Sequence, residues 1–426
     1  MIRNDLTVED ARAGMKALAP SIEGYARLIA RTGAHVKPGQ EVVVQAPVEA
    51  APFARTLTAQ AYEAGAGHVT VIWGDDALTR LEYENVETAY FETVPEWKRV
   101  QLDSLAEAGA CFIFLEGSDP SALVGIDPAK PAAAGKARNM QCRRFRRGLD
   151  YNINPWCIAG VPTAAWAERV FPGIPSEVAV YRLWGAVLSA ARADGEDPES
   201  SWELHNATFE KNLRFLNEHH FKELRYRAGN GTDFSVGLTD RHLWAGGCCE
   251  TPDGHPFFPN MPTEEVFTSP DCETTDGIVY SAIPLIHHGN KVDRFWMRFE
   301  KGSVVDFGAE QGYETLKSIL DTDEGARRLG EVALISKNTP IRESETLFYS
   351  TLYDENASCH LALGIGFAEC YEGGYDMSVE ELREHGVNSS STHVDFMIGT
   401  DDLNITGVCD DGTEVPVFVN GQWGWE

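Results

Sequence analysis

Between Ser21 and Asp119 the sequence switches repeatedly between helical and strand periodicity, and this alternation limits the chain to a small set of folds. SIEGYARLIARTGAHV has the apolar spacing of a helix, and GQEVVVQAP is typical of a short buried strand. A second helix, PFARTLTAQAYEAGAG, ends at glycine, and HVTVIW completes a strand–helix–strand unit. The stretches ACFIFLEGS and WCIAGVPTAAWAERVF continue the pattern. The sequence therefore predicts an α/β N-terminal domain with a mostly parallel sheet.

The usual nucleotide-binding motifs are absent from this predicted sheet. The turn after EVVVQ reads APVEAAPF, without GxGxxG, and the GxxxxGKS/T pattern occurs nowhere in the sequence. We therefore interpret the N-terminal half as a scaffold or as a wall that sets specificity.

A change in composition marks a domain boundary near residue 195. The stretch ARADGEDPESS is acidic and poor in large apolar residues, as linkers are. Beyond the helix-like WELHNATFEKNLRFLNEHHF, short alternating stretches such as TDFSVGL and VPVFVNGQW are separated by turns. We predict an α/β domain over residues 1–195 and an α+β, strand-rich domain over residues 196–426.

The formal net charge of -29 argues against nucleic acid as a partner, because binding to a phosphate backbone needs clustered basic residues. The basic cluster in CRRFRRG is expected to be a solvated or subunit-facing segment. The N-terminal residues mix charges, and no apolar run reaches the roughly 18 residues of a membrane span. We therefore expect a cytoplasmic protein that does not bind membranes. The nine cysteines form no CxxC, which argues against a disulfide framework or a thiolate zinc site.

One stretch near the C-terminus carries ionisable residues on a single face. In THVDFMIG, His393 and Asp395 point to one side of a strand, while Val394 and Phe396 point to the other. A buried carboxylate needs a partner. Alone, the pattern fits an Asp395 that orients His393, the wet face of an edge strand, or a metal site made of imidazole and carboxylate ligands.

Three further segments place acids or a histidine among apolar residues. Glu264 and Glu265 are adjacent in PNMPTEEVFTSP, Glu331 precedes an apolar strand in ARRLGEVALI, and His360 lies in ENASCHLALGIG. Each alone is explained by a satisfied structural residue. Together with THVDFMIG they favour a hydrophilic cavity that holds cations.

Four motifs follow one another along the chain: NMPTEEVFT, LDTDEGARRLGEVALI, LYDENASCHLALG and THVDFMIG. In this order they closely resemble the aminopeptidase T and aminopeptidase S family of metallopeptidases (family M29). The likeness covers essentially the whole chain, since HVKPGQEVVVQAP and DDGTEVPVFVNGQW also look like this family. The resemblance implies a two-metal exopeptidase with five matching ligands: Glu265, Glu331, His360, His393 and Asp395. It also implies a C-terminal metal-binding domain after the α/β domain, and a homodimer that encloses its active site.

The chemistry implied by the resemblance is the release of N-terminal residues from short peptides. Two divalent cations, for which zinc, cobalt and manganese are all suited, would generate a bridging hydroxide that attacks the scissile carbonyl. The substrate would be a peptide with a free N-terminus, whose amine binds a metal or an acidic group. Glu264 neighbours a ligand without being needed as one, so it is our candidate general base. The alternative for Glu264 is an outer or exposed structural role.

One position departs from the family pattern. Family members commonly carry a tyrosine seven residues after the histidine of HLALG, and Phe367 stands there in this sequence. Phenylalanine lacks the hydroxyl that would hydrogen-bond to a transition state. The candidates to replace that hydroxyl are Tyr353, Tyr371 and Tyr375.

Two other functions stay open at this point. His360, His393 and one carboxylate would also form the 2-His-1-carboxylate site of a mononuclear iron enzyme. Phe367 leaves open an inactive, metal-stabilised binding protein. The adjacent His287 and His288 would point to opposite faces of a strand, so we expect outer or surface roles for them.

Overall fold

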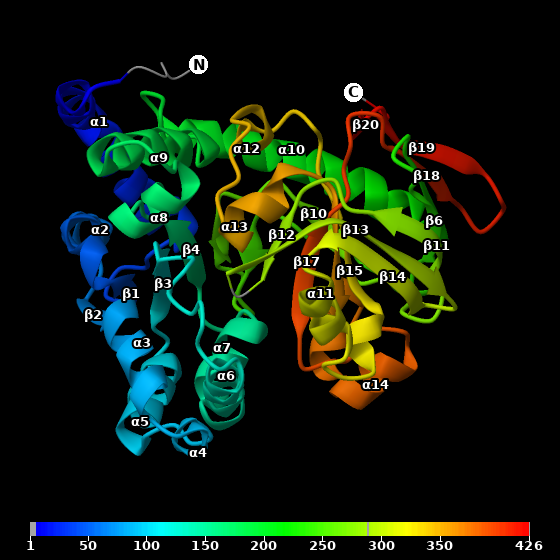
Figure 1. Ribbon diagram of the computed structural model, residues 1–426, viewed down its shortest axis with the longest axis horizontal. Coiled ribbons are helices and arrows are strands. Elements are labelled where there is room, and N and C mark those ends of the chain that lie inside the picture. Colours follow the sequence, from blue (N-terminus) through cyan, green and yellow to red (C-terminus); the bar gives the residue numbers. More distant parts are fainter. Residues whose placement is uncertain (1–5, 288, 426) are drawn as a thin grey trace. The chain divides into compact units, whose positions relative to one another are not determined.

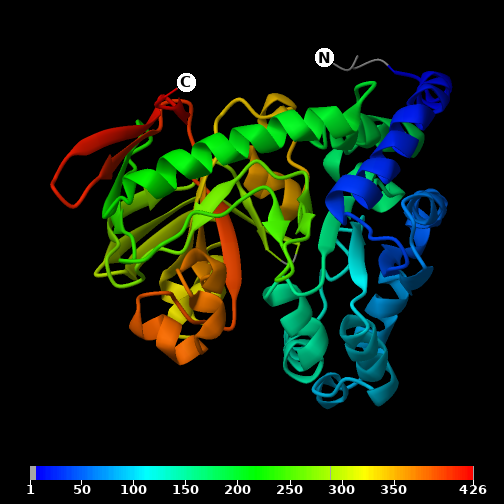
Figure 2. The same cartoon turned by 180° about the vertical axis from the view of Figure 1, so that it is seen from behind.

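The computed structural model describes residues 6–287 and 289–425, so His288 lies outside the described residues. The chain divides into two compact units (Figure 1). Unit 1 comprises Met1–His205 and Cys248–Pro262, and unit 2 comprises Asn206–Gly247 and Thr263–Glu426. The division falls within α10 (Pro198–His219), the long green helix in Figure 2. The predicted boundary at residues 195 and 196 comes just before this helix.

Unit 1 is built on a parallel sheet with the strand order β2-β1-β3-β4-β9. Its strands are β1 (Glu41–Pro47), β2 (His68–Gly74), β3 (Cys111–Glu116), β4 (Trp156–Gly160) and β9 (Asn260–Met261). The consecutive residues Val42, Val43 and Val44 are all fully buried, so β1 is covered on both faces. The predicted α/β domain with its parallel sheet is confirmed.

Helices connect the parallel strands, because a parallel pair needs a long crossover. The helices of this unit are α1 (Val8–Leu28), α2 (Ala51–Glu63), α3 (Asp76–Asn85), α4 (Thr88–Phe91), α5 (Glu96–Glu107), α6 (Ala129–Gln141), α7 (Arg143–Asp150), α8 (Ala164–Val170) and α9 (Ser176–Ala190). A short antiparallel pair, β7 (Cys249–Glu250) with β8 (Pro256–Phe257), precedes β9.

Unit 2 is rich in antiparallel strands, as predicted. Its larger sheet has nine strands in the order β12-β13-β11-β6-β5-β18-β19-β20, with β14 paired to β13. These strands are β5 (Glu223–Arg227), β6 (Asp233–Gly237), β11 (Asp276–Tyr280), β12 (Leu285–His287), β13 (Asn290–Glu300), β14 (Ser303–Gln311), β18 (Asn404–Val408), β19 (Glu414–Val419) and β20 (Gln422–Trp423). The helices after residue 300 are α11 (Tyr313–Leu320), α12 (Pro340–Glu343), α13 (Thr351–Asp354) and α14 (Val379–Glu384).

A second, four-stranded sheet of unit 2 has one apolar and one polar face. Its order is β10 (Val266–Thr268), β15 (Leu329–Leu334), β16 (His360–Gly364) and β17 (His393–Met397). The apolar face belongs to the core of the unit and includes Val266, Val332, Leu361, Val394 and Phe396. Because side chains alternate along a strand, the residues between these point to the opposite face.

Across residues 6–287 and 289–425, no helix combines the length and hydropathy that a membrane span requires. The cytoplasmic location and the lack of membrane binding stay predictions.

Candidate metal centre

Strand pairing brings predicted ligands together on the polar face of the four-stranded sheet. In antiparallel strands, directly opposite residues point to the same side. Ala362 of β16 lies opposite both Glu331 of β15 and Asp395 of β17, so these side chains share a face. His360 and His393 each precede one of these residues by two positions, so they point to that face as well.

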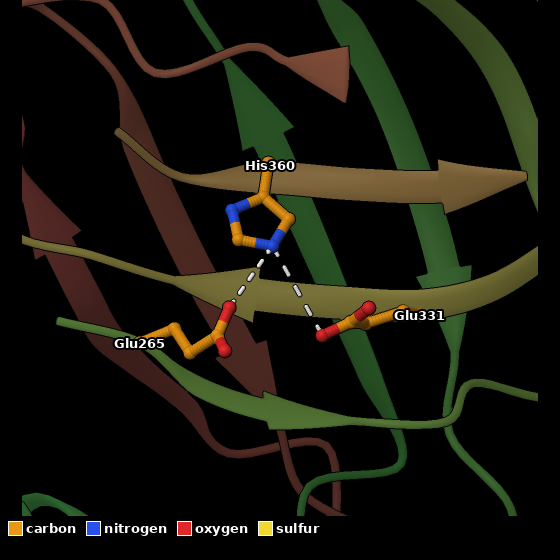
Figure 3. Close-up of side chains that lie close together, drawn as sticks. All are labelled: Glu265, Glu331 and His360. Carbon is orange, nitrogen blue, oxygen red and sulfur yellow. Dashed lines mark ion pairs between the residues drawn. The ribbon is translucent and has the colours of Figure 1, made fainter. Parts of the chain in front are cut away.

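Glu265, Glu331 and His360 form the first ligand group (Figure 3). Nε2 of His360 lies 3.2 Å from Oε2 of Glu265 and 4.0 Å from Oε1 of Glu331. The exposed fractions of these three residues are 8%, 4% and 1% for Glu265, Glu331 and His360. Figure 3 shows both carboxylates pointing toward the imidazole. Such a buried cluster of one imidazole and two carboxylates can hold a divalent cation.

Glu331, His393 and Asp395 form the second ligand group. Nε2 of His393 lies 3.1 Å from Oε2 of Glu331 and 3.1 Å from Oδ1 of Asp395. In each group the ligand atoms lie within 4.8 Å of one another. The Glu331 carboxylate is common to both groups, with Oε1 toward His360 and Oε2 toward His393.

Backbone carbonyls fix the orientation of both imidazoles. Nδ1 of His360 lies 2.9 Å from the carbonyl oxygen of Glu355, and Nδ1 of His393 lies 2.9 Å from that of Ile365. A carbonyl oxygen only accepts, so Nδ1 donates in both cases. In a neutral imidazole Nε2 then carries a lone pair, and this lone pair points at the carboxylate cluster. Metal-binding histidines are usually held in this way. The donor set therefore fits divalent cations.

The carboxylates raise the pKa of both histidines. Burial alone would lower the pKa of His360, but the hydrogen bond with Glu265 and the surrounding carboxylate charges raise it to about 9. Burial also acts to lower the pKa of His393, and Asp395 and Glu331 together raise it well above its usual value. Burial acts to raise the pKa of Asp395, but the charge and hydrogen bond of His393 together with the charge of His360 lower it below its usual value. This concentration of negative charge in a buried place favours bound cations.

A further carboxylate in the cluster, Glu355, was not predicted. It begins the short 3-10 helix Glu355–Ala357 between α13 and β16, five residues before His360. Burial and the charges of Asp395, Glu265 and Glu331 raise the pKa of Glu355 well above its usual value. The prediction considered charges that interrupt apolar runs, whereas Glu355 lies in the polar stretch DENAS. The carbonyl that orients His360 belongs to Glu355 as well, so the same residue supports the site through its backbone.

The proposed base, Glu264, is half-buried next to Glu265. Its backbone N–H donates to Oδ1 of Asn356 at 2.7 Å, and Asn356 is the neighbour of Glu355. This contact ties the segment before β10 to the helical turn before β16. The catalytic role of Glu264 stays a prediction.

Phe367 lies directly beside the second ligand group. Its ring centroid is 5.0 Å from that of His393. Two of the three tyrosines considered as replacements donate their hydroxyls elsewhere: Tyr371 to Asp240 at 3.2 Å and Tyr375 to Glu369 at 2.9 Å. The ring of Tyr353 stacks on Phe348.

Comparison with known proteins identifies the family. The sequence model described as "Thermophilic metalloprotease (M29)" matches residues 19–423. The chain belongs to the M29 metalloprotease family. Among its M29 relatives, Aminopeptidase 2 of Geobacillus stearothermophilus is 43% identical over 405 residues, covering 95% of this chain and 98% of the relative. Aminopeptidase T of Thermus aquaticus is 42% identical over 409 residues, covering 96% and 100%. The resemblance drawn from the sequence motifs is confirmed, and M29 membership makes the chain a hydrolase.

Solved structures agree with this assignment. Wild-type AmpT from Thermus thermophilus superimposes with a TM-score of 0.89 at 39% identity, covering 96% of this chain and 100% of that one. The structure of 2,5-dihydroxypyridine dioxygenase from Pseudomonas putida KT2440 matches with a TM-score of 0.50 at 12% identity over 98% of both chains. This second likeness shows only that the fold is shared.

Proposed function

We propose that this M29 protein is a two-metal aminopeptidase that removes single residues from the N-terminus of short peptides. The observation that carries the proposal is the pair of ligand groups that share Glu331 on one face of one sheet. The names of Aminopeptidase 2 and Aminopeptidase T, which align over nearly the whole chain, support an exopeptidase.

Each ligand group would hold one divalent cation. Glu265 and His360 would bind the first and His393 and Asp395 the second, with Glu331 between them. When bound, two such cations supply a water of lowered pKa and polarise the peptide carbonyl. Zinc, cobalt and manganese all suit these nitrogen and oxygen ligands.

The chain's own residues would orient the peptide and move the proton. A free N-terminal amine is positively charged near pH 7, and the surrounding carboxylates favour that charge. We assign Glu264 as the base that takes the proton of the attacking water and passes it to the leaving amine. Glu355 is the rival for this role, because its carboxyl lies within the electrostatic reach of Glu265, Glu331 and Asp395.

Isosteric substitutions distinguish the two carboxylates. We expect Glu264→Gln to keep two metal ions per chain and to lose at least about 100-fold in kcat on a leucyl anilide, the lower end of the range typical of a general base. Glu355→Gln is the matched comparison. If Glu264→Gln keeps both ions and nearly full turnover, while Glu355→Gln keeps both ions and loses turnover, the base is Glu355.

Metal content separates the aminopeptidase from the other two functions. We expect two divalent ions per chain and hydrolysis that a chelator and His393→Ala abolish. One ferrous ion with oxygen-dependent turnover would instead indicate a mononuclear iron enzyme. Bound metal without any hydrolysis would indicate the inactive binding protein. The homodimer and the cytoplasmic location are part of the proposal, and sedimentation of the purified chain tests the first.

A further inference from the structure

The polar face of the four-stranded sheet carries an aromatic residue beside the ligands. β10 pairs Phe267 with Ala333 of β15, and Ala333 lies opposite His360 of β16. Phe267 and His360 therefore point to the same face. The residue between them is only an alanine, and Ala362 occupies the next position on β16. Both alanines are fully buried, and Phe267 and His360 flank Ala333 on this face.

Phe267 lies outside the hydrophobic core cluster of unit 2. Its neighbours in β10, Val266 and Thr268, are buried, whereas Phe267 itself is half-buried. β10 is the last strand in the order of its sheet, and within the described part of the chain only an isolated bridge to Ala245 pairs with Phe267 on the outer side, so the ring stands at one border of the ligand cluster. A half-buried phenylalanine at the border of a polar cluster is a ready contact for an apolar group of a ligand.

A second ring extends this border toward His393. The backbone N–H of Phe367 donates to Oγ of Ser269 at 2.7 Å, and Ser269 directly follows β10. The centroids of Phe367 and Phe267 are 5.5 Å apart at an interplanar angle of 71°, an edge-to-face contact. Phe367 in turn lies 5.0 Å from the ring of His393. We call Phe267 and Phe367 the aromatic wall.

We propose that the aromatic wall binds the side chain of the substrate's N-terminal residue and makes the enzyme prefer large apolar residues there. This inference rests on the proposed aminopeptidase function. In such a reaction the carbonyl that is attacked is bonded to the Cα of the N-terminal residue. Its side chain must therefore lie within a few bonds of the ligand cluster, where the wall touches His393. Neither ring offers a hydrogen bond, so the wall selects by apolar contact.

The aromatic wall would also favour binding of an apolar N-terminal residue of the substrate over a charged one. An N-terminal acid would place its carboxylate against two rings and beside the carboxylates of Glu331 and Asp395. An N-terminal leucine would exchange water for ring contacts. A single extra or missing methylene group in an apolar pocket typically discriminates by roughly 10- to 200-fold.

The test is the ratio of kcat/KM for leucyl and alanyl anilides on the metal-loaded protein. We expect the wild-type chain to prefer leucine at least about tenfold, and Phe367→Ala and Phe267→Ala to lower the leucine-to-alanine ratio about tenfold. Phe367→Tyr keeps the ring and should keep the ratio. Phe307→Ala is the matched control, because Phe307 is another half-buried phenylalanine of unit 2 and its ring stacks on Tyr313.

Binding of the product amino acids gives a readout without turnover. Calorimetry should show L-leucine binding more tightly than L-alanine to the wild-type protein, and this difference should shrink in Phe267→Ala. Thermal unfolding identifies any variant that fails to fold, in which case the other ring carries the test. An unchanged leucine-to-alanine ratio in both alanine variants, or an equal loss of kcat/KM for both substrates, would overturn the proposed role of the aromatic wall. Absence of hydrolysis of every aminoacyl substrate by the wild type would instead overturn the aminopeptidase itself.

Discussion

At the scale of single residues, Glu331 links the two ligand groups of the candidate metal centre. Its two oxygens point to different histidines, and burial is the largest influence that raises its pKa, followed in the same direction by the charge of Glu265. Among the described residues, Asp395 by contrast is grouped with Glu331 and His393 and not with Glu265 and His360. The five proposed ligands are therefore not equivalent, and the loss of Glu331 should affect both cations.

Glu331→Gln is expected to lower the affinity for both cations by more than roughly 100-fold, since even the outer partners of metal ligands are worth 10- to 100-fold. Asp395→Asn should retain about one ion per chain. Elemental analysis after dialysis measures both. Glu310→Gln is the control, because Glu310 is a surface carboxylate paired with Arg294. Two tightly held ions in Glu331→Gln would contradict a shared ligand.

His242, which lies away from the proposed ligands, makes the stability of the folded chain depend on pH. It is 2% exposed, its Nδ1 donates to the carbonyl of Thr239 at 2.8 Å, and its Nε2 has no hydrogen-bond partner within residues 6–287 and 289–425. Its pKa is lowered to about 4, mainly by burial. The Thr239 carbonyl acts to raise this pKa, and the charge of the neighbouring His220 acts to lower it further.

The folded pKa of His242 lies below the unfolded value of 6.5, so the unfolded chain binds more protons between pH 6.5 and 4. Stability should therefore fall as the pH drops through this window, by about 3 kcal/mol from this residue. His242→Asn keeps a donor for Thr239 but cannot be protonated. Urea unfolding at pH 7 and pH 5 should show a smaller acid loss in the variant. Equal losses in both proteins would rule out this role.

At the scale of elements, the sequence predicts which face of a strand a residue lies on better than it predicts which strands pair. The alternation in THVDFMIG correctly places Val394 and Phe396 in the core and His393 and Asp395 on the other face. The period of a strand determines this locally. The order of strands is decided by long-range pairing, so nothing local predicts that β9 joins β4 across about a hundred residues. Glu355 escaped prediction for the same reason, because only the fold brings its polar segment to the ligands.

The pairing of β16 with β17 depends on a backbone position that suits only glycine. Gly364 lies opposite His393 with a φ of +109°, and a Cβ there would lie 2.0 Å from the carbonyl oxygen of Thr392. Gly364→Ala should destabilise the metal-free chain by roughly 3 kcal/mol and weaken metal binding through His393.

Gly412→Ala is the matched control for this strand position. Gly412 also has a positive φ, +82°, but a Cβ there would meet nothing within 4 Å. We expect a loss of about 1 kcal/mol, from backbone strain alone. Urea unfolding measures both variants. Equal destabilisation would mean that the close approach to Thr392 is relieved by a small shift of the strand.

At the scale of the whole molecule, the path of the chain explains why a single sequence boundary cannot describe its units. After unit 2 has begun, Cys248–Pro262 returns to unit 1 and adds β9 to the parallel sheet. The chain re-enters unit 2 at Thr263, two residues before the proposed ligand Glu265. Amino-acid composition changes too gradually to show that such a short segment belongs to the other unit. Strand pairing shows it for each residue of the segment.

The acidic ligand cluster also makes the stability of the whole chain depend on cations. Burying three proposed carboxylate ligands on one face costs free energy unless cations or histidines neutralise them, and the molecule as a whole already carries a net charge of -29. A cation that binds only the folded chain stabilises it by about 2.7 kcal/mol at 100 times its Kd. We therefore expect zinc, cobalt or manganese to raise the midpoint of thermal unfolding by roughly 5 °C or more, and a chelator to reverse this. Glu331→Gln should respond weakly, because its two groups have lost their common ligand, and Glu310→Gln should respond like the wild type. An equal shift in Glu331→Gln would mean that the stabilising cations bind elsewhere on the acidic surface.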